Sequence, residues 1–153
     1  MKALVWTAPE QMAIETAADP VPAEDEVVIR VEAVGICGSE IEGYLGHNSL
    51  RVPPLIMGHE FCGRIASCGS KAGHLKPGQK VVVNPLLSCG NCKHCRKGNP
   101  QLCPSRRIVG IHRPGAFGQL VAVPASGVVP VPDGMNPFRA ALAAGQPDQG
   151  AQG

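Results

Sequence analysis

Apolar and polar residues alternate along much of the chain in short runs, which is the pattern of β-strands rather than of helices. In the clearest run, residues 26–34, one face of an extended segment would carry Val27, Ile29, Val31 and Ala33, which predicts a strand with one buried face. Similar runs, separated by Pro, Gly, Asn and Asp, occupy residues 3–6, 12–15, 61–67, 80–83, 119–123 and 128–131. Short strands at this spacing predict a barrel-like, all-β domain.

One helix is predicted near the end of the sequence. Asn136 is a suitable N-cap, Pro137 suits the first helical position, and residues 138–144 are good helix formers. The segment 144–153 carries no large apolar side chain, so it cannot offset the entropy of ordering. We therefore expect one domain over residues 1–143 and a disordered tail over 144–153.

Composition narrows the class of protein. The chain has 153 residues, about one domain, and only five aromatic side chains, so the core is expected to consist of Val, Leu, Ile and Ala. A net charge of +2 argues against a nucleic-acid or anionic-membrane partner. No stretch reaches the roughly 18 apolar residues that a membrane span needs, and no signal-peptide core forms before Pro9. We expect a soluble, cytoplasmic protein.

Four of the seven cysteines are crowded into one segment. C-G-N-C-K-H-C at 89–95 contains two successive C-x2-C steps, and Cys103 follows. This spacing suits a metal better than a disulfide framework. Zinc is the best candidate for four thiolates, iron is the main competitor, and unligated thiols are the plain alternative. His94 lies inside the segment, but a fourth cysteine is available, so it is interpreted as a non-ligand.

Basic residues surround these cysteines and resemble a nucleic-acid patch. Because the chain lacks the aromatic side chains that a single-strand reader interleaves with its charges, we interpret them as compensation for thiolate charge and as solvated loop surface. They are Lys93, Arg96, Lys97, Arg106 and Arg107.

A second constellation combines Cys37 with the His59-Glu60 pair. A lone buried cysteine or histidine is more often ordinary packing than a ligand. Here a thiolate, an imidazole and an adjacent carboxylate all follow apolar, β-rich stretches, and one sulfur with one nitrogen and one oxygen or water is the donor set of a catalytic zinc.

These motifs occur in the order found in the zinc-dependent medium-chain alcohol and polyol dehydrogenases. G-H-E-F-C-G at 58–63, with Gly69 after five further residues, matches that family's G-H-E-x2-G-x5-[GA] signature. The flanking motifs are C-G-S at 37–39, K-P-G-Q-K-V-V at 76–82, the cysteine segment, and G-A-F at 115–117. From Met1 to about Leu142 the chain resembles the GroES-like catalytic domain of these enzymes.

The resemblance implies a mainly β fold: a GroES-like, partly open β-barrel with short helices and a zinc-binding lobe at about 86–107. It implies oxidation of a small alcohol or polyol, a secondary alcohol becoming a ketone, by zinc-assisted hydride transfer to NAD(P). Two zinc ions are implied, one catalytic and one structural. The leaning toward polyols rests on Glu60 directly after His59 and on C-G-S at 37–39.

The resemblance also assigns residue roles. Cys37 and His59 are implied as ligands of the catalytic zinc, with Glu60 as a third ligand or one that exchanges with water. Ser39 matches the hydroxyl that passes the alcohol proton outward. The implied ligands of the structural zinc are Cys89, Cys92, Cys95 and Cys103.

Two positions depart from the family pattern. Glu42 stands where histidine is frequent, and Glu40 stands where aspartate is common, which leaves the outer proton relay open. A proton could pass to Glu42 through water, but we favour a solvated carboxylate on a short helix.

The 153 residues contain no G-x-G-x-x-G, so there is no Rossmann domain in this chain. We expect a catalytic half truncated before its cofactor domain, with NAD(P) bound only in the full-length enzyme, little or no turnover alone, and self-association through the surface that would face the missing domain. The alternatives are a non-catalytic zinc-binding β-domain acting through a protein partner, and redox sensing by the cysteines.

Overall fold

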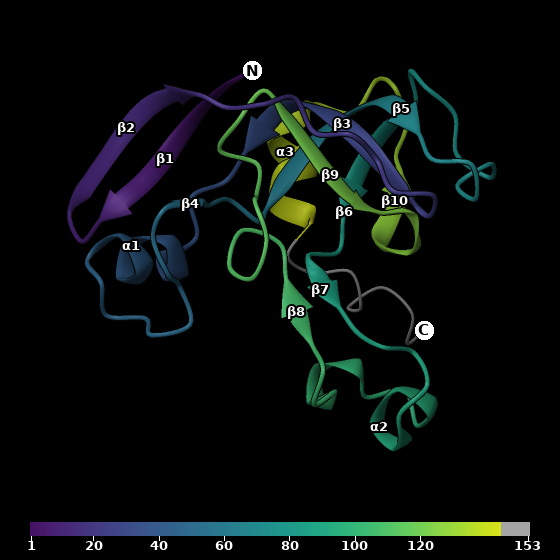
Figure 1. Ribbon diagram of the computed structural model, residues 1–153. Coiled ribbons are helices and arrows are strands. Elements are labelled where there is room, and N and C mark those ends of the chain that lie inside the picture. The colour runs from purple at the N-terminus through teal and green to yellow at the C-terminus, as the bar shows by residue number, and fades with distance from the viewer. Residues whose placement is uncertain (145–153) are drawn as a thin grey trace.

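The computed structural model describes residues 1–144, in which strands predominate and helices are short (Figure 1). The strands are β1 (Lys2–Ala8), β2 (Gln11–Thr16), β3 (Glu26–Val34), β4 (Leu55–Ile56), β5 (Phe61–Cys68), β6 (Lys80–Val83), β7 (Leu86–Leu87), β8 (Arg107–Ile108), β9 (Leu120–Pro124) and β10 (Val128–Pro130). The helices are α1 (Gly38–Tyr44), α2 (Lys93–Arg96) and α3 (Pro137–Ala143), with 3-10 turns η1 (Pro100–Leu102) and η2 (Ala125–Gly127).

All the runs predicted from the sequence are strands. The bounds of β3 and β6 are those predicted, and the other five differ from the predicted ranges by at most two residues at an end. The sequence pattern does not predict β4, β7 and β8, because each has two residues and cannot show an alternation.

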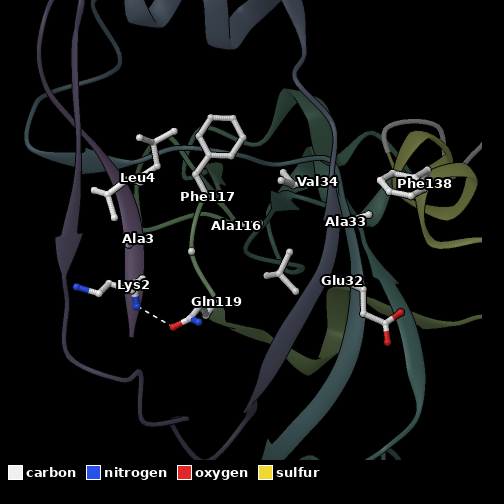
Figure 2. A pocket seen from close by; sticks show the side chains of 13 residues that line it. Lys2, Ala3, Leu4, Glu32, Ala33, Val34, Ala116, Phe117, Gln119 and Phe138 are labelled. Carbon is white, nitrogen blue, oxygen red and sulfur yellow. Dashed lines mark hydrogen bonds between the residues drawn. The ribbon is translucent and has the colours of Figure 1, made fainter.

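Two sheets form the body of the domain. Five antiparallel strands make the larger sheet, in the order β10-β6-β5-β3-β9, and the smaller sheet has the order β2-β1-β4. Figure 2 shows the segment 116–119 between β1 and β3. There Leu4 N–H donates to the Phe117 carbonyl at 2.7 Å and Lys2 N–H donates to Gln119 Oε1 at 2.8 Å. Within residues 1–144 no strand pairing joins β10 to β9, so the predicted barrel is partly open.

The core lies on one face of the larger sheet and is built mainly from small branched side chains. Phe61 is its one large aromatic member, and Trp6 lies in a separate cluster with Leu55 and Met57. The fully buried aliphatic members of the core include Val27, Ile29, Val81, Val83, Val109 and Val123. The composition-based expectation for the core is therefore confirmed.

The expectation of one buried face on β3 is wrong. Val27, Val28 and Ile29 are all buried in succession, and Ala33 belongs to a second cluster, with α3, instead of to the cluster that holds Val27. Val28 shows that the second face of β3 is also covered, and the change of face at Ala33 follows from a register shift after Val31, where Glu32 is the extra residue in β3. An extra residue in one strand of a pair reverses which face the following side chains occupy.

Helix α3 covers this second cluster through three alanines. The Asn136 side chain accepts hydrogen bonds from Phe138 N–H at 3.0 Å and Arg139 N–H at 3.3 Å, which confirms the predicted cap. The small residues let the helix approach the sheet, where Cys62 and Val82 lie beneath it. The residues of the second cluster are Ala33, Cys62, Val82, Ala140, Ala141 and Ala144.

A lobe formed by residues 88–106 projects from the body at the lower end of Figure 1. The pair β7 and β8 joins it to the body, with Leu87 opposite Arg107. The predicted tail falls mostly outside the described residues, at 145–153. Among the helices of residues 1–144, none has the length and apolar character required to cross a membrane.

Substitution of Gly63 tests the packing of β5 on β3. A Cβ at Gly63 would lie 2.2 Å from the Arg30 carbonyl oxygen, so Gly63→Ala is expected to lower the free energy of unfolding by about 1–3 kcal/mol. Gly73→Ala is the matched control, since a Cβ there meets nothing within 4 Å, and a change below about 1 kcal/mol is expected. Urea denaturation measures both, and equal midpoints for the two variants would contradict the packing argument.

Candidate metal centres

The lobe brings the four cysteines at 89, 92, 95 and 103 together by local structure. Cys92 is the N-cap of α2, and its Sγ accepts from Cys95 N–H at 3.5 Å. Gly90, with φ of +72°, turns the chain between Cys89 and Cys92. Cys103 follows η1, is fully buried, and its Sγ accepts from Cys89 N–H at 3.5 Å. Each sulfur is therefore placed by a turn or a helix end.

The sulfur positions fit one tetrahedral ion. Sγ–Sγ distances are 3.5 Å for Cys92–Cys95, 3.5 Å for Cys89–Cys103 and 4.0 Å for Cys89–Cys95. All four sulfurs lie within 4.8 Å of one another. Four zinc–sulfur bonds of about 2.3 Å give tetrahedron edges of about 3.8 Å, so the cluster has the size that zinc requires.

Backbone donors favour thiolates at two of these positions. N–H groups of Asn91 and Cys92 lower the pKa of Cys89 to about 6, and the N–H of Cys95 lowers the pKa of Cys92. Desolvation, and next the hydrogen bond with Cys92, raise the pKa of Cys95 to about 11. Residues 86–107 contain five Lys or Arg and no Asp or Glu, so the surrounding charge opposes that of the sulfurs.

A second group lies where α1 meets the segment between β4 and β5. One atom each from Cys37, Glu40 and His59 lies within 4.8 Å of the other two. Cys37 caps α1, so its N–H donates to Glu40 Oε2 at 2.9 Å, one turn into the helix. The other oxygen of this buried carboxylate, Oε1, contacts His59 Nδ1. With Nδ1 engaged by a carboxylate, Nε2 of His59 is the ring nitrogen left for a metal.

The structure does not bring Glu60 into this group. The Glu60 side chain lies against Gly35, where a Cβ would be 3.1 Å from Oε2, and the Glu60 carbonyl accepts from Gly35 N–H at 2.7 Å. Its ligand role stays a prediction. Glu42 is 60% exposed and pairs with His47 at 3.2 Å, in agreement with a solvated carboxylate.

Two residues that contact the site are not among the site residues predicted from the sequence. Glu40 has a local signal, since it stands three residues after the N-cap, at the spacing of a capping box. Arg51 has no such signal: it lies in a loop, yet its side chain is fully buried and its Nη2 donates to Ser39 Oγ at 3.3 Å. Ser39 therefore lies beside a buried cation.

The motif glycines hold His59 in place. Gly58 has φ of +93°, and the segment 115–117 crosses directly over it. Ala116 N–H donates to the Gly58 carbonyl and Phe117 N–H to the Met57 carbonyl, each at 2.9 Å. A Cβ at Gly115 would lie 2.2 Å from the Gly58 carbonyl oxygen, so only glycine permits this approach. Gly69, at the end of the motif, packs as closely on the Ala23 carbonyl.

An apolar groove of about 470 Å³ opens beside Glu40. Its wall presents aliphatic and aromatic side chains with almost no polar surface, which suits a small organic molecule. The lining residues are Leu4, Met12, Val34, Ile36, Glu40, Ile41, Tyr44, Met57 and Phe117.

Comparison with known proteins finds matches across nearly the whole chain. The family described as the alcohol dehydrogenase GroES-like domain matches residues 23–133. L-galactonate-5-dehydrogenase of Escherichia coli is 33% identical over 142 residues, which are 93% of this chain and 42% of the relative.

Two solved structures superpose closely. An E. coli alcohol dehydrogenase in complex with NADH has a TM-score of 0.87 at 34% identity, over 93% of this chain and 41% of its own. A thermostable alcohol dehydrogenase from Pyrobaculum aerophilum, bound to cobalt and zinc, has a TM-score of 0.87 at 29% identity, over 94% and 44%. The chain thus spans about two fifths of the length of these proteins.

Alkylation of the metal-free lobe tests the placement of the backbone donors. Because the thiolate is the reactive form and the pKa of Cys89 is lowered to about 6, Cys89 is expected to react with iodoacetamide half-maximally near pH 6. Cys95, with a pKa of about 11, is expected to stay unreacted up to pH 9. Peptide mass spectrometry after chelation measures both, and a shared midpoint for the two cysteines would show that the donors do not act as described.

Proposed function

The chain belongs to the family of alcohol dehydrogenase GroES-like domains, and on that basis we propose that it forms the zinc-binding, substrate-holding half of an NAD(P)-dependent alcohol or polyol dehydrogenase. The observation that carries this proposal is the group of Cys37, Glu40 and His59 beside an apolar groove. A thiol and an imidazole nitrogen within 4.8 Å of each other suit a zinc site that keeps coordination positions open for water or substrate.

In this proposal Cys37 Sγ and His59 Nε2 hold the ion, and Glu60 is a third or exchanging ligand. Zinc, when bound, supplies a Lewis acid that polarises the alcohol oxygen and lowers its pKa. In this proposal Glu40 Oε1 accepts a hydrogen bond from a protonated Nδ1 of His59 and fixes the direction of the ring. The four-cysteine cluster of the lobe holds a second, structural zinc.

Ser39 is proposed to carry the alcohol proton away from the site. Its Oγ already accepts a hydrogen bond from Arg51 Nη2 at 3.3 Å, which leaves the hydroxyl proton free to point elsewhere. The apolar groove holds the carbon skeleton of the substrate and limits water near the reacting oxygen.

The hydride acceptor in this proposal is NAD(P), held by a nucleotide domain other than these residues. The proposal draws support from the E. coli structure in complex with NADH. It also rests on the absence of G-x-G-x-x-G from the 153 residues.

A second candidate function is zinc-dependent contact with a protein partner. The observation that favours it is the outer face of α3, where Phe138 and Leu142 are 69% and 68% exposed. Phe138 also borders the groove drawn in Figure 2. Self-association through the surface that would face a nucleotide domain stays a prediction. An ion bound at Cys37 and His59 would favour the dehydrogenase function, since a partner-binding module needs no metal ion with free coordination positions.

Zinc content tests the two proposed sites separately. We expect two ions per chain, one in His59→Ala with unchanged folding, and one in Cys95→Ser with a destabilised lobe, because four-thiolate sites contribute to folding. Elemental analysis with circular dichroism measures these outcomes. Cys68→Ser is the matched control: Cys68 lies outside both groups, so this variant should keep both ions. An unchanged zinc content in His59→Ala would refute the open site.

Turnover is expected to require the nucleotide domain. The 153-residue chain should therefore give no alcohol-dependent formation of NADH or NADPH above the rate without enzyme, followed by absorbance with a panel of secondary alcohols and polyols. A rate abolished by His59→Ala but present in the unmodified chain would contradict this expectation while supporting the metal site.

A further inference from the structure

Arg51 is the least expected buried group of the molecule. It lies in the loop between α1 and β4, and its side chain is fully buried. Only three buried residues of the described chain are polar or charged, and Arg51 and Glu40 are two of them. Removing a guanidinium from water is unfavourable unless several acceptors surround it, so its contacts indicate what it holds.

The contacts of Arg51 join its own loop to two other segments at the metal group. Nη1 donates to the Gly110 carbonyl at 3.0 Å, beside the crossing that holds Gly58. Nη2 donates to Ser39 Oγ at 3.3 Å and lies 3.5 Å from Glu40 Oε1. One guanidinium thus ties α1 to the loop that precedes Arg113.

The carboxylate of Glu40 is fully engaged by these contacts. Oε2 accepts from Cys37 N–H, and Oε1 is shared by His59 Nδ1 and Arg51. Rotation of the carboxylate away from His59 would break the contacts with both Arg51 and the helix cap. The position of Glu40, and through it the orientation of the imidazole, therefore depends on Arg51.

Helix α1 is shaped to admit this side chain. Gly43 lies against Arg51, and a Cβ at Gly43 would be 2.3 Å from Cδ and 2.6 Å from Nε. The Nε atom is buried without a hydrogen-bond partner, which is unfavourable. The other contacts of the guanidinium must therefore offset this cost. A glycine in a helix is itself unfavourable, which again indicates that space for Arg51 is needed here.

We propose that Arg51 is a positioning residue for the metal group: by holding Glu40 against His59 Nδ1, it directs His59 Nε2 and Cys37 Sγ toward one ion. The inference rests on the proposed function, because it concerns the same site. Lysine cannot replace arginine in this role, since a single ammonium cannot reach the Gly110 carbonyl, Ser39 and Glu40 together in the planar geometry of a guanidinium.

The test measures zinc affinity of the 153-residue chain by competition with a chromophoric chelator. In Arg51→Lys and in Gly43→Ala the ion at Cys37 and His59 should bind about 10–100-fold more weakly, the usual effect of removing a group that orients a ligand. The ion in the four-cysteine lobe should keep its affinity and serves as an internal reference. Gly43→Ala keeps every charge, so it tests position even if Arg51→Lys folds poorly.

Arg113→Lys is the matched control. Arg113 is also a largely buried guanidinium with an unpartnered Nε, but it pairs with Glu26 at 2.7 Å and with the Ala122 carbonyl, away from the metal group. Both ions should bind to it with unchanged affinity. An equal loss in Arg113→Lys and Arg51→Lys would overturn the inference, because general destabilisation would then explain both.

Two further outcomes separate this inference from the proposed function. If His59→Ala loses one ion while Arg51→Lys and Gly43→Ala bind it as tightly as the unmodified chain, the inference alone is overturned. If His59→Ala retains both ions, the proposed metal site fails and the inference fails with it. In the cobalt-substituted chain, the visible absorption of the ion at Cys37 and His59 should also shift in Arg51→Lys and not in Arg113→Lys.

Discussion

The close crossing of two backbone segments at Gly58 is the constraint on which the site depends. The segment 115–117 hydrogen-bonds to residues 56–58 with no side chain between them, and this contact is available only to glycine at 58 and 115. The crossing fixes the residue after it, His59, and brings β1 and β4 next to the larger sheet. The motif around His59 is thus recognisable in the sequence because the backbone crossing requires its glycine, in addition to any need for the histidine as a ligand.

The two candidate metal centres are assembled in different ways. All four sulfurs of the lobe come from one stretch of fifteen residues and are placed by a helix cap, a glycine turn and backbone donors. Cys37 and His59 come from separate elements, and a buried carboxylate and guanidinium lie behind them. The lobe has the means to form from local contacts, whereas the open site exists only when the whole domain has folded.

The same difference explains how far the sequence could be interpreted. Strands with clear alternation, the cap at Asn136 and the four-cysteine cluster follow from local patterns, and all are present in the structure. The face of Ala33 could not be inferred, because it depends on one extra residue of β3, Glu32, in the pairing of β3 with β5. Arg51 was missed because nothing in its own neighbourhood distinguishes a buried arginine from a solvated one. Local pattern does not encode contacts between distant segments.

The narrow attachment of the lobe has a consequence for how such a chain can change. Its two ends meet at Leu87 and Arg107, which are direct partners across β7 and β8. A short turn could close that gap without disturbing the registers of the larger sheet, so the lobe is an insertion that can be shortened, exchanged or grafted as a unit. The domain therefore combines a framework constrained by the strand registers and by the crossing at Gly58 with a lobe attached at a single strand pair.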